Sequence, residues 1–277
     1  MAHIPGSTVK NDYRLAENYA ANSGFLKHAG RHVELCAYDD GEGGVDPECE
    51  LRVALARMRD AGHESAVVKL RETKAGIGII ALKGKTDLQI HDELYEKFDW
   101  ALVAHAGKMG AFIVQSHVVM EHEYRMVVVS GYLVGGAGCI EEFTPLDNGG
   151  FHFDTRTRRS RGSFGSKCSV IDSHPEIVKQ YLKASPQIIK DLREAEYGTG
   201  ADVPHGPETF VLDLCLVNGN VAVVEVNPAR NFGLYAMNYQ GIMVAMRWVA
   251  NRHIHGDGPT QIVTSPKPYS TAKKMRP

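Results

Sequence analysis

The fold of this chain is decided most clearly by residues 209–233, which read TFVLDLCLVNGNVAVVEVNPARNFG. Two apolar runs of strand length flank an Asn-Gly dipeptide at 218–219, which is typical of a β-hairpin turn. Asp213, Glu225 and Asn227 interrupt these runs. Because a carboxylate inside an apolar strand is costly unless it is paired or binds a metal, the three residues are candidates for a functional site.

Glu225 and Asn227 stand two residues apart, so on a strand their side chains share a face and offer oxygen atoms to one ion. Such oxygens suit Mg²⁺, or alternatively Mn²⁺, and not Zn²⁺, which takes His or Cys ligands. A two-residue turn would place Asp213 opposite Val224, so a shared ion requires a three-residue loop or a compensating β-bulge. The alternative interpretation is an amphipathic hairpin with one face in solvent.

The composition of the whole chain is that of a globular protein. It has 277 residues, of which 43% are hydrophobic and 23% charged, and a formal net charge of −2. This balance argues against a nucleic-acid binder, and no apolar run approaches the roughly 18 residues that cross a bilayer. Five cysteines form no Cys-x-x-Cys pair and no secretory signal is recognisable, so we expect reduced thiols and a cytoplasmic location.

Helical and strand-like patterns are mixed along the chain, and the strand-like runs suggest mainly antiparallel pairing. This order predicts the α+β class and not a doubly wound parallel sheet. The expected strands are residues 66–70, 77–82, 111–115, 123–130, 132–143, 151–161, 210–217 and 221–227. The expected helices are residues 12–21, 24–35, 47–61, 87–106, 175–197, with a break at Ser185-Pro186, and 240–253.

A second candidate for a functional site is a basic segment that contains glycines. Residues 66–78, AVVKLRETKAGIG, carry Lys69 near the end of a strand, followed by Lys74 and two glycines. Ammonium groups beside a flexible turn suit nucleotide phosphates, although solvated lysines are the simpler alternative. The spacing fits neither a Walker loop nor a Rossmann turn.

A third signal lies in residues 112–131, FIVQSHVVMEHEYRMVVVSG. Glu123 and Arg125 are two residues apart, so they lie side by side on one strand face. The simpler alternative here is a cross-strand ion pair at the surface.

These three segments, in this order, resemble the ATP-grasp superfamily over about residues 66–245. The resemblance is closest to the small clade named for one Arg and two Lys. Lys69, Lys74 and Gly76 match the spacing of that clade's first motif, and residues 123–125 match its E-x-R strand, which also resembles the "DIR" strand of the ribosomal-protein glutamate ligases. Asp213 and residues 225–227 match its acidic strand and E-x-N metal motif, and residues 233–235 match its trailing GLY.

The resemblance implies an ATP-grasp fold with two α+β subdomains that grip ATP. The strand 112–117 would supply backbone contacts to adenine, with Gln115 at a position where many relatives have Glu. By resemblance, the nucleotide contacts are Lys69, Lys74, Gly76, Gln115 and Glu123, the catalytic residues are Arg125, Arg230 and Lys74, and the metal ligands are Asp213, Glu225 and Asn227.

The domain organisation expected from this resemblance has four parts. Residues 1–45 form an N-terminal helical extension, 46–110 the small ATP-grasp subdomain, 111–258 the large subdomain with the metal hairpin, and 259–277 a flexible tail.

The activity implied is that of an ADP-forming carboxylate-amine ligase that makes an amide or peptide bond through an acyl phosphate. Its partners would be ATP, a carboxylate substrate and an amine acceptor, which is an amino acid, a peptide or a protein tail, with no nucleic acid and no membrane. The oligomeric state is left open, with a homodimer as one alternative. An ATP-dependent phosphotransferase on the same fold and a non-catalytic ATP-binding module are the alternatives. Neutralising Asp213 or Glu225 is expected to abolish turnover and leave the fold intact.

Four further basic residues lie where related ligases place groups that bind the substrate acid. They are Arg156, Arg158, Arg159 and Arg161. Guanidinium groups bind carboxylate or phosphate bidentately, and a cationic loop is the alternative interpretation.

Overall fold

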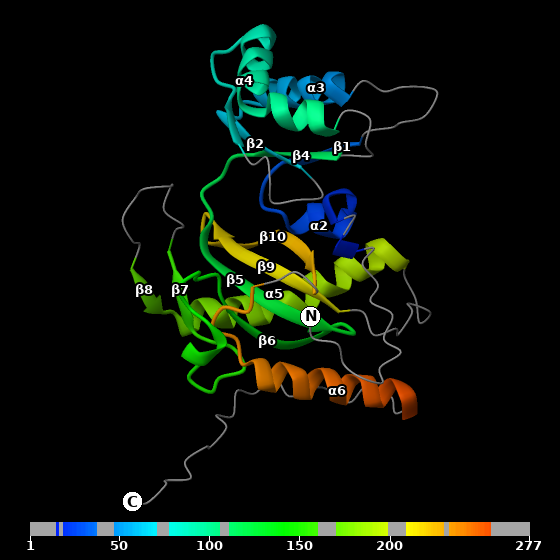
Figure 1. The fold of residues 1–277 in the computed structure, drawn as a ribbon, viewed down its shortest axis with the longest axis vertical. Helices are drawn as coiled ribbons and strands as arrows, with labels where there is room; N and C mark the ends of the chain where they lie inside the picture. The colour runs from blue at the N-terminus through cyan, green and yellow to red at the C-terminus, as the bar shows by residue number, and fades with distance from the viewer. Residues whose placement is uncertain are drawn as a thin grey trace, which may run out of the picture. The chain divides into compact units, whose positions relative to one another are not determined.

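The computed structural model describes residues 15–16, 19–37, 47–70, 78–105, 111–159, 170–198, 209–229 and 233–255. The chain divides into a small unit, Glu17–Val119, and a large unit, Met120–Pro277 together with Met1–Ala16. Each unit combines helices with a four-stranded sheet (Figure 1), as the α+β class predicts. Within the described residues, no helix is long and apolar enough to cross a membrane.

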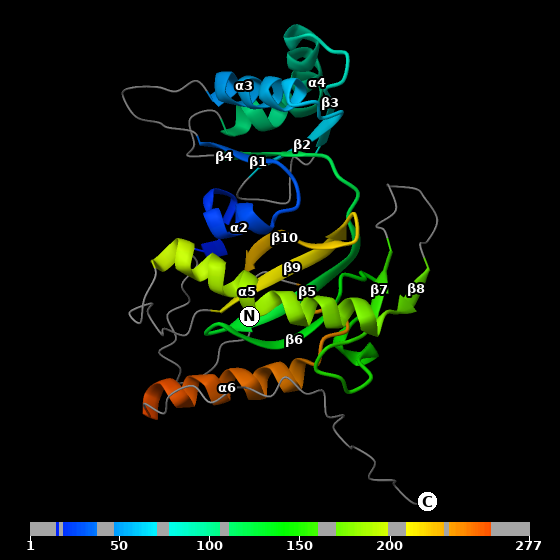
Figure 2. The same ribbon diagram turned by 180° about the vertical axis from the view of Figure 1, so that it is seen from behind.

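The small unit is one antiparallel sheet in the order β1-β4-β2-β3 with helices on both faces. Figures 1 and 2 show α2 on the opposite face of this sheet from α3 and α4. The elements are η1 (Tyr19–Ala21), α2 (Ser23–His28), β1 (Val33–Ala37), α3 (Pro47–Asp60), β2 (Ser65–Leu70), β3 (Gly78–Ala81), α4 (Asp87–His105) and β4 (Ala111–Ser116).

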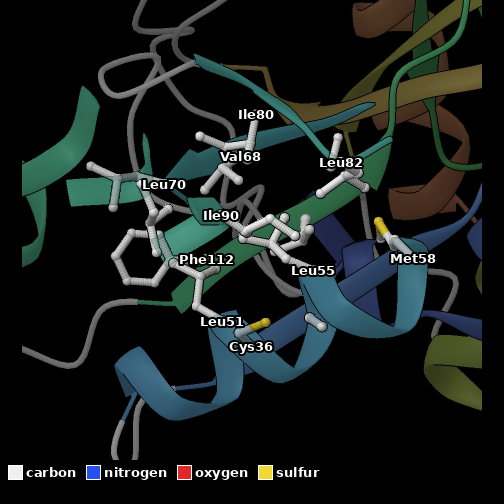
Figure 3. Packing of buried hydrophobic residues seen from close by; sticks show 14 residues of the cluster. Cys36, Leu51, Leu55, Met58, Val68, Leu70, Ile80, Leu82, Ile90 and Phe112 are labelled. Atoms are coloured by element: carbon white, nitrogen blue, oxygen red, sulfur yellow. The ribbon is translucent and has the colours of Figure 1, made fainter. Parts of the chain in front are cut away.

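The core of the small unit lies between the sheet and helices α3 and α4. Side chains alternate along β2, so Ala66, Val68 and Leu70 are buried while the residues between them are half-buried. Figure 3 shows Val68 and Leu70 packed with Phe112 of β4, and with Leu51 and Leu55 of α3. The opposite face of the sheet is therefore the one that carries Lys69.

The first turn of α4 follows the predicted capping box. The backbone N–H of Thr86 donates to Gln89 Oε1 at 2.9 Å, and the N–H of Gln89 donates to Thr86 Oγ1 at 3.3 Å. These two reciprocal bonds satisfy backbone donors that the helix itself leaves without partners.

The sheet of the small unit extends beyond the expected boundaries of residues 46–110. Sequence reasoning predicted a helix over residues 24–35, but α2 ends at His28 and Leu35 lies in β1. Strand β4, expected in the large subdomain, pairs with β1 on one side and β2 on the other. Pairing with distant strands thus enlarges the sheet at both ends of the predicted 46–110 segment.

The large unit contains a sheet in the order β10-β9-β5-β6, covered by one long helix on each face. Met126 of β5 contacts Ser185 of α5, whereas Val127 packs in a cluster with Ile242 of α6. The elements are β5 (Glu121–Val129), β6 (Tyr132–Gly138), η2 (Pro145–Asp147), β7 (Arg156–Arg158), β8 (Ile171–Ser173), α5 (Pro175–Tyr197), β9 (Thr209–Val217), β10 (Asn220–Pro228) and α6 (Tyr239–His255).

Strand β6 is shorter than the predicted 132–143, and glycines allow another segment to lie against it. The N–H of Gly136 donates to the carbonyl of His152 at 3.0 Å, and the N–H of Asp154 donates to the carbonyl of Gly136 at 3.0 Å. A Cβ on Gly138 would lie 2.4 Å from the carbonyl oxygen of Arg156. Of the predicted strand 151–161, the structure describes residues 151–159, and within these Arg156–Arg158 forms β7.

Helix α5 runs without the predicted break, although Pro186 lies inside it. Pro186 is exposed, and the hydroxyl of Ser185 donates to the carbonyl of Tyr181 at 2.6 Å. Tyr181, Ile188 and Leu192 form a buried face along the helix. Packing of this face outweighs the hydrogen bond that proline removes.

Candidate functional site

The 209–228 hairpin has the β-bulge that a shared site requires. Its turn contains two residues, Asn218 with φ 51° and Gly219 with φ 76°, and Asn220 pairs with Val217. The register then shifts between Val223 and Glu225, which places Glu225 opposite Asp213. The prediction that these carboxylates face each other is confirmed, through the bulge and not through a longer loop.

Strand β5 brings a third charged residue into the same row. Arg125 pairs with Asp213 across β5 and β9. Its Nε donates to Asp213 Oδ1 at 2.8 Å and an Nη donates to Oδ2 at 2.6 Å. The Arg125 side chain is 2% exposed and that of Asp213 0%, so the interpretation of a surface ion pair is wrong for Arg125.

Asn227 connects the two carboxylates. Its Nδ2 donates to Asp213 Oδ2 at 3.1 Å and to Glu225 Oε1 at 2.8 Å. Because ionised carboxylates only accept, the amide must turn its nitrogen toward them and its oxygen away. The amide therefore fixes the spacing of Asp213 and Glu225 in the row.

The electrostatics of this row keep Arg125 charged. Burial disfavours the guanidinium charge, but the hydrogen bonds and the negative charge of Asp213 outweigh burial and raise the pKa of Arg125. With both carboxylates ionised, Arg125, Asp213 and Glu225 have a formal net charge of −1. The site can therefore attract a cation beside Glu225 while it presents guanidinium N–H groups nearby.

The segment 233–235, matched to the GLY motif, covers the guanidinium. An Nη of Arg125 donates to the carbonyl of Gly233 at 3.4 Å, and the Tyr235 ring centroid lies 5.2 Å from the guanidinium carbon. Tyr235 adopts a φ of 46°, which is unusual for a bulky residue. Sequence reasoning assigned Tyr235 no role, and its motif match was the signal that could have identified it.

The three predicted metal ligands do not fit one ion equally well. Both oxygens of Asp213 accept from Arg125, so Asp213 acts as the partner of the guanidinium in this arrangement. Carboxylate and amide oxygens are ligands that Mg²⁺ prefers, but in the observed conformation Asn227 turns its amide nitrogen, and not its oxygen, toward Glu225. No group of three His, Cys, Asp or Glu side chains suited to a metal occurs among the described residues.

The small unit brings two predicted nucleotide residues to one sheet face. Val67 pairs with Gln115 and Lys69 with Ile113, so the side chains of Lys69 and Gln115 lie on the same side, opposite α3 and α4. The backbone of β4 is paired with strands on both sides. That the strand 112–117 supplies backbone contacts to adenine stays a prediction.

The remaining predicted residues are distributed as follows. Glu123 is half-buried on β5, on the same face as Arg125. Lys74, Gly76, Arg230 and Arg161 lie outside the described residues.

The described arginines of the 156–161 segment all have acidic partners. Arg156 binds Asp154 through Nε at 2.9 Å and Nη at 2.6 Å, and its guanidinium carbon lies 4.3 Å from the Phe143 ring centroid. Arg158 pairs with Glu141 and Glu142, and Arg159 with Glu121. These contacts use the guanidinium groups to tie β7 to neighbouring segments.

Comparison with known proteins shows a likeness in structure only. No protein-family model matches the sequence, and a search of curated proteins finds no match. The D-cycloserine synthetase DcsG has a TM-score of 0.52 and 13% identity, with 87% of this chain and 70% of that chain covered.

Two other solved structures resemble the chain less closely. The D-alanine–D-alanine ligase from Bacillus anthracis, complexed with ATP, has a TM-score of 0.48 and 13% identity, over 89% of this chain and 69% of that chain. The RimK-domain ATP-grasp protein from Sphaerobacter thermophilus has a TM-score of 0.41 and 14% identity, over 86% and 64%. The likeness to the synthetase concerns the fold, and it confirms the fold that the sequence resemblance implies. The assignment to one clade stays a prediction.

Proposed function

We propose that this chain, which has the ATP-grasp fold, is an ATP-dependent carboxylate-amine ligase that forms an amide or peptide bond and releases ADP. The observation that supports this most is the row of Arg125, Asp213, Asn227 and Glu225 across three adjacent strands. Because Arg125 is held in place before substrate binds, its guanidinium can stabilise charge on a transferred phosphoryl group without reorganising.

In this proposal Asp213 orients Arg125, and Arg125 contacts the substrate. Asp213 receives two short hydrogen bonds from Nε and one Nη, which leaves the guanidinium little rotational freedom. The contact of the other Nη with Gly233 is the longest of the three, at 3.4 Å. That nitrogen is the one expected to exchange its partner for an anionic oxygen of phosphate or acyl group.

Glu225 would hold Mg²⁺ through a carboxylate oxygen. Asn227 would hold it through its amide oxygen after the amide has turned over, because in the structure the amide nitrogen faces Glu225. Bound there with the nucleotide, the ion would neutralise phosphate charge. Lys69, on the sheet face of the small unit opposite α3 and α4, would contact phosphate as the resemblance implies.

A covalent thiol intermediate has no support among the described cysteines. Cys36, Cys139 and Cys215 are buried and form no disulfide. Burial raises the pKa of the Cys36 thiol to about 12, so this thiol is a poor nucleophile at neutral pH. Attack of the amine on an acyl phosphate needs no such group.

The test is a screen of amino acids and peptides with Mg·ATP and hydroxylamine, with nucleotide and acid followed together by chromatography. An acyl phosphate is electrophilic, so hydroxylamine diverts it to a hydroxamate even when the natural amine is absent. We expect ADP and hydroxamate from the unchanged protein. Lys69→Ala should reduce both products, whereas Lys83→Ala, which removes an exposed lysine paired with Glu64, should not.

The other outcomes each contradict the proposal. AMP and pyrophosphate would indicate adenylation of the acid. ADP with a stable phosphorylated alcohol would indicate a phosphotransferase, and nucleotide binding without turnover of any acid would indicate a non-catalytic ATP-binding module.

A further inference from the structure

The N-terminal segment 19–31 connects the two predicted nucleotide residues of the small unit. Gln115 and Lys69 lie on the sheet face opposite α3 and α4, and α2 lies on that same side (Figures 1 and 2). Side chains of this segment contact both residues. Sequence reasoning treated the segment as a helical extension without a role in the site.

Arg31 fixes the orientation of the Gln115 amide. Its Nε donates to Gln115 Oε1 at 2.9 Å, although the residues are 84 positions apart. A guanidinium can only donate, so the amide oxygen must face Arg31 and the amide nitrogen must turn away from it. Gln115 is 7% exposed, which leaves its amide little room to rotate. The side chain therefore presents N–H donors to anything that binds beside it.

Arg31 is itself held by its own segment. An Nη donates to the carbonyl of Ala29 at 2.8 Å, and the guanidinium carbon lies 5.7 Å from the ring centroid of Phe25. Phe25 is fully buried, at 0% exposed. The guanidinium is thus anchored from two directions besides Gln115.

The other end of the same aromatic cluster reaches Lys69. The rings of Tyr19 and Phe25 meet edge to face, with centroids 4.9 Å apart. Lys69 Nζ lies 5.6 Å from the centroid of the Tyr19 ring. A continuous series of contacts therefore runs from Gln115 through Arg31, Phe25 and Tyr19 to Lys69.

We propose that Arg31 is a positioning residue of the nucleotide site, which holds Gln115 so that its amide nitrogen donates to an acceptor atom of a purine base. The inference rests on the proposed function, since it needs Gln115 to contact the nucleotide. A held amide offers only donors to the base, whereas an amide that can turn offers either donors or an acceptor. Arg31 then contributes to discrimination between bases as well as to affinity.

The test is isothermal titration of Mg·ATP and Mg·GTP into the full chain and into four variants, Arg31→Ala, Arg31→Lys, Gln115→Ala and the double variant Arg31→Ala/Gln115→Ala. Arg57→Ala is the matched control. It removes an arginine of the same unit, in α3, which pairs with Glu34. Thermal melts verify that each variant is folded.

We expect Arg31→Ala to raise the Kd for the preferred nucleotide about tenfold, the value of one positioned hydrogen bond. The ratio of the two Kd values should move toward one. Arg31→Lys, which keeps the charge and one donor, should restore part of both effects. In the Gln115→Ala background, Arg31→Ala should have no further effect, because Arg31 acts through Gln115. Arg57→Ala should bind as the unchanged protein does.

Two results would overturn the inference separately from the proposed function. An unchanged Kd ratio in Arg31→Ala, or equal effects of Arg31→Ala with and without Gln115, would show that Arg31 has no positioning role while the chain still binds nucleotide. If Arg31→Ala does not fold, the same comparison with Arg31→Lys decides. Failure of the unchanged protein to bind either nucleotide would overturn the proposed function and this inference with it.

Discussion

Replacing Asp213 with Asn should destabilise the large unit strongly, whereas the sequence alone led to the expectation that the fold stays intact. Arg125 is 2% exposed and both of its short hydrogen bonds end on Asp213. An Asn keeps one acceptor, but in either orientation its amide nitrogen would face an N–H donor of Arg125. Removing one partner of a buried pair typically costs about 3–5 kcal/mol, and the retained acceptor places our expectation at about 3 kcal/mol.

The assay is urea unfolding followed by circular dichroism, with calorimetry as a second measurement. A loss of about 3 kcal/mol corresponds to a fall in Tm of roughly 6–12 °C for a unit of this size. The slope with urea should stay constant, because the native surface does not change. Glu121→Gln is the matched control, since it neutralises the carboxylate partner of Arg159, whose side chain is 76% exposed. Its urea midpoint should not move.

A double variant tests whether the loss of stability comes from leaving Arg125 buried without a charged partner. Arg125→Met with Asp213→Leu removes both charges and should recover part of the lost stability, because no unpaired charge stays buried. A loss below about 1 kcal/mol in Asp213→Asn would refute the argument that the pair is buried and mutually dependent.

Three further predictions concern other features. Glu225→Gln keeps an acceptor for Asn227, so Tm measured without nucleotide should stay unchanged. The rise in Tm on adding Mg·ATP should become smaller, and an unchanged rise would exclude Glu225 from the metal site. Burial and the nearby His174 lower the pKa of His122, so the folded state binds fewer protons than the unfolded state and stability should fall as pH drops below about 6.5. His122→Asn, which tolerates the native φ of 55°, should flatten that dependence in urea titrations at pH 5 to 7, and an equally steep profile would contradict the assignment. Glu93 accepts from the N–H of Ala81 on the edge strand β3, so Glu93→Ala should increase self-association measured by size-exclusion chromatography; a monomer at all concentrations would argue against this edge protection.

Local sequence patterns determined much of the hairpin site. Two apolar runs of strand length and the Asn-Gly dipeptide predicted the two strands and their turn, since turn conformation depends on neighbouring residues. The two-residue period of a strand showed that Glu225 and Asn227 share a face. The requirement that Asp213 face Glu225 predicted a bulge or a longer loop, and the bulge is what occurs.

The partners of these residues depended on contacts between distant parts of the chain. Asp213 binds Arg125 from 88 positions away, and Arg31 binds Gln115 from 84 positions away. No local period indicates which strands lie adjacent, because that choice depends on the packing of the whole sheet.

The sequence by itself therefore determined which residues carry charge inside apolar strands and which faces they share. Only the tertiary structure decided that Asp213 pairs with an arginine, that Leu35 lies in a strand, and that α5 continues through Pro186. In each case a local preference was outweighed by burial or by pairing with a distant segment, and the free energy of those contacts exists only once the sheets and helices have packed.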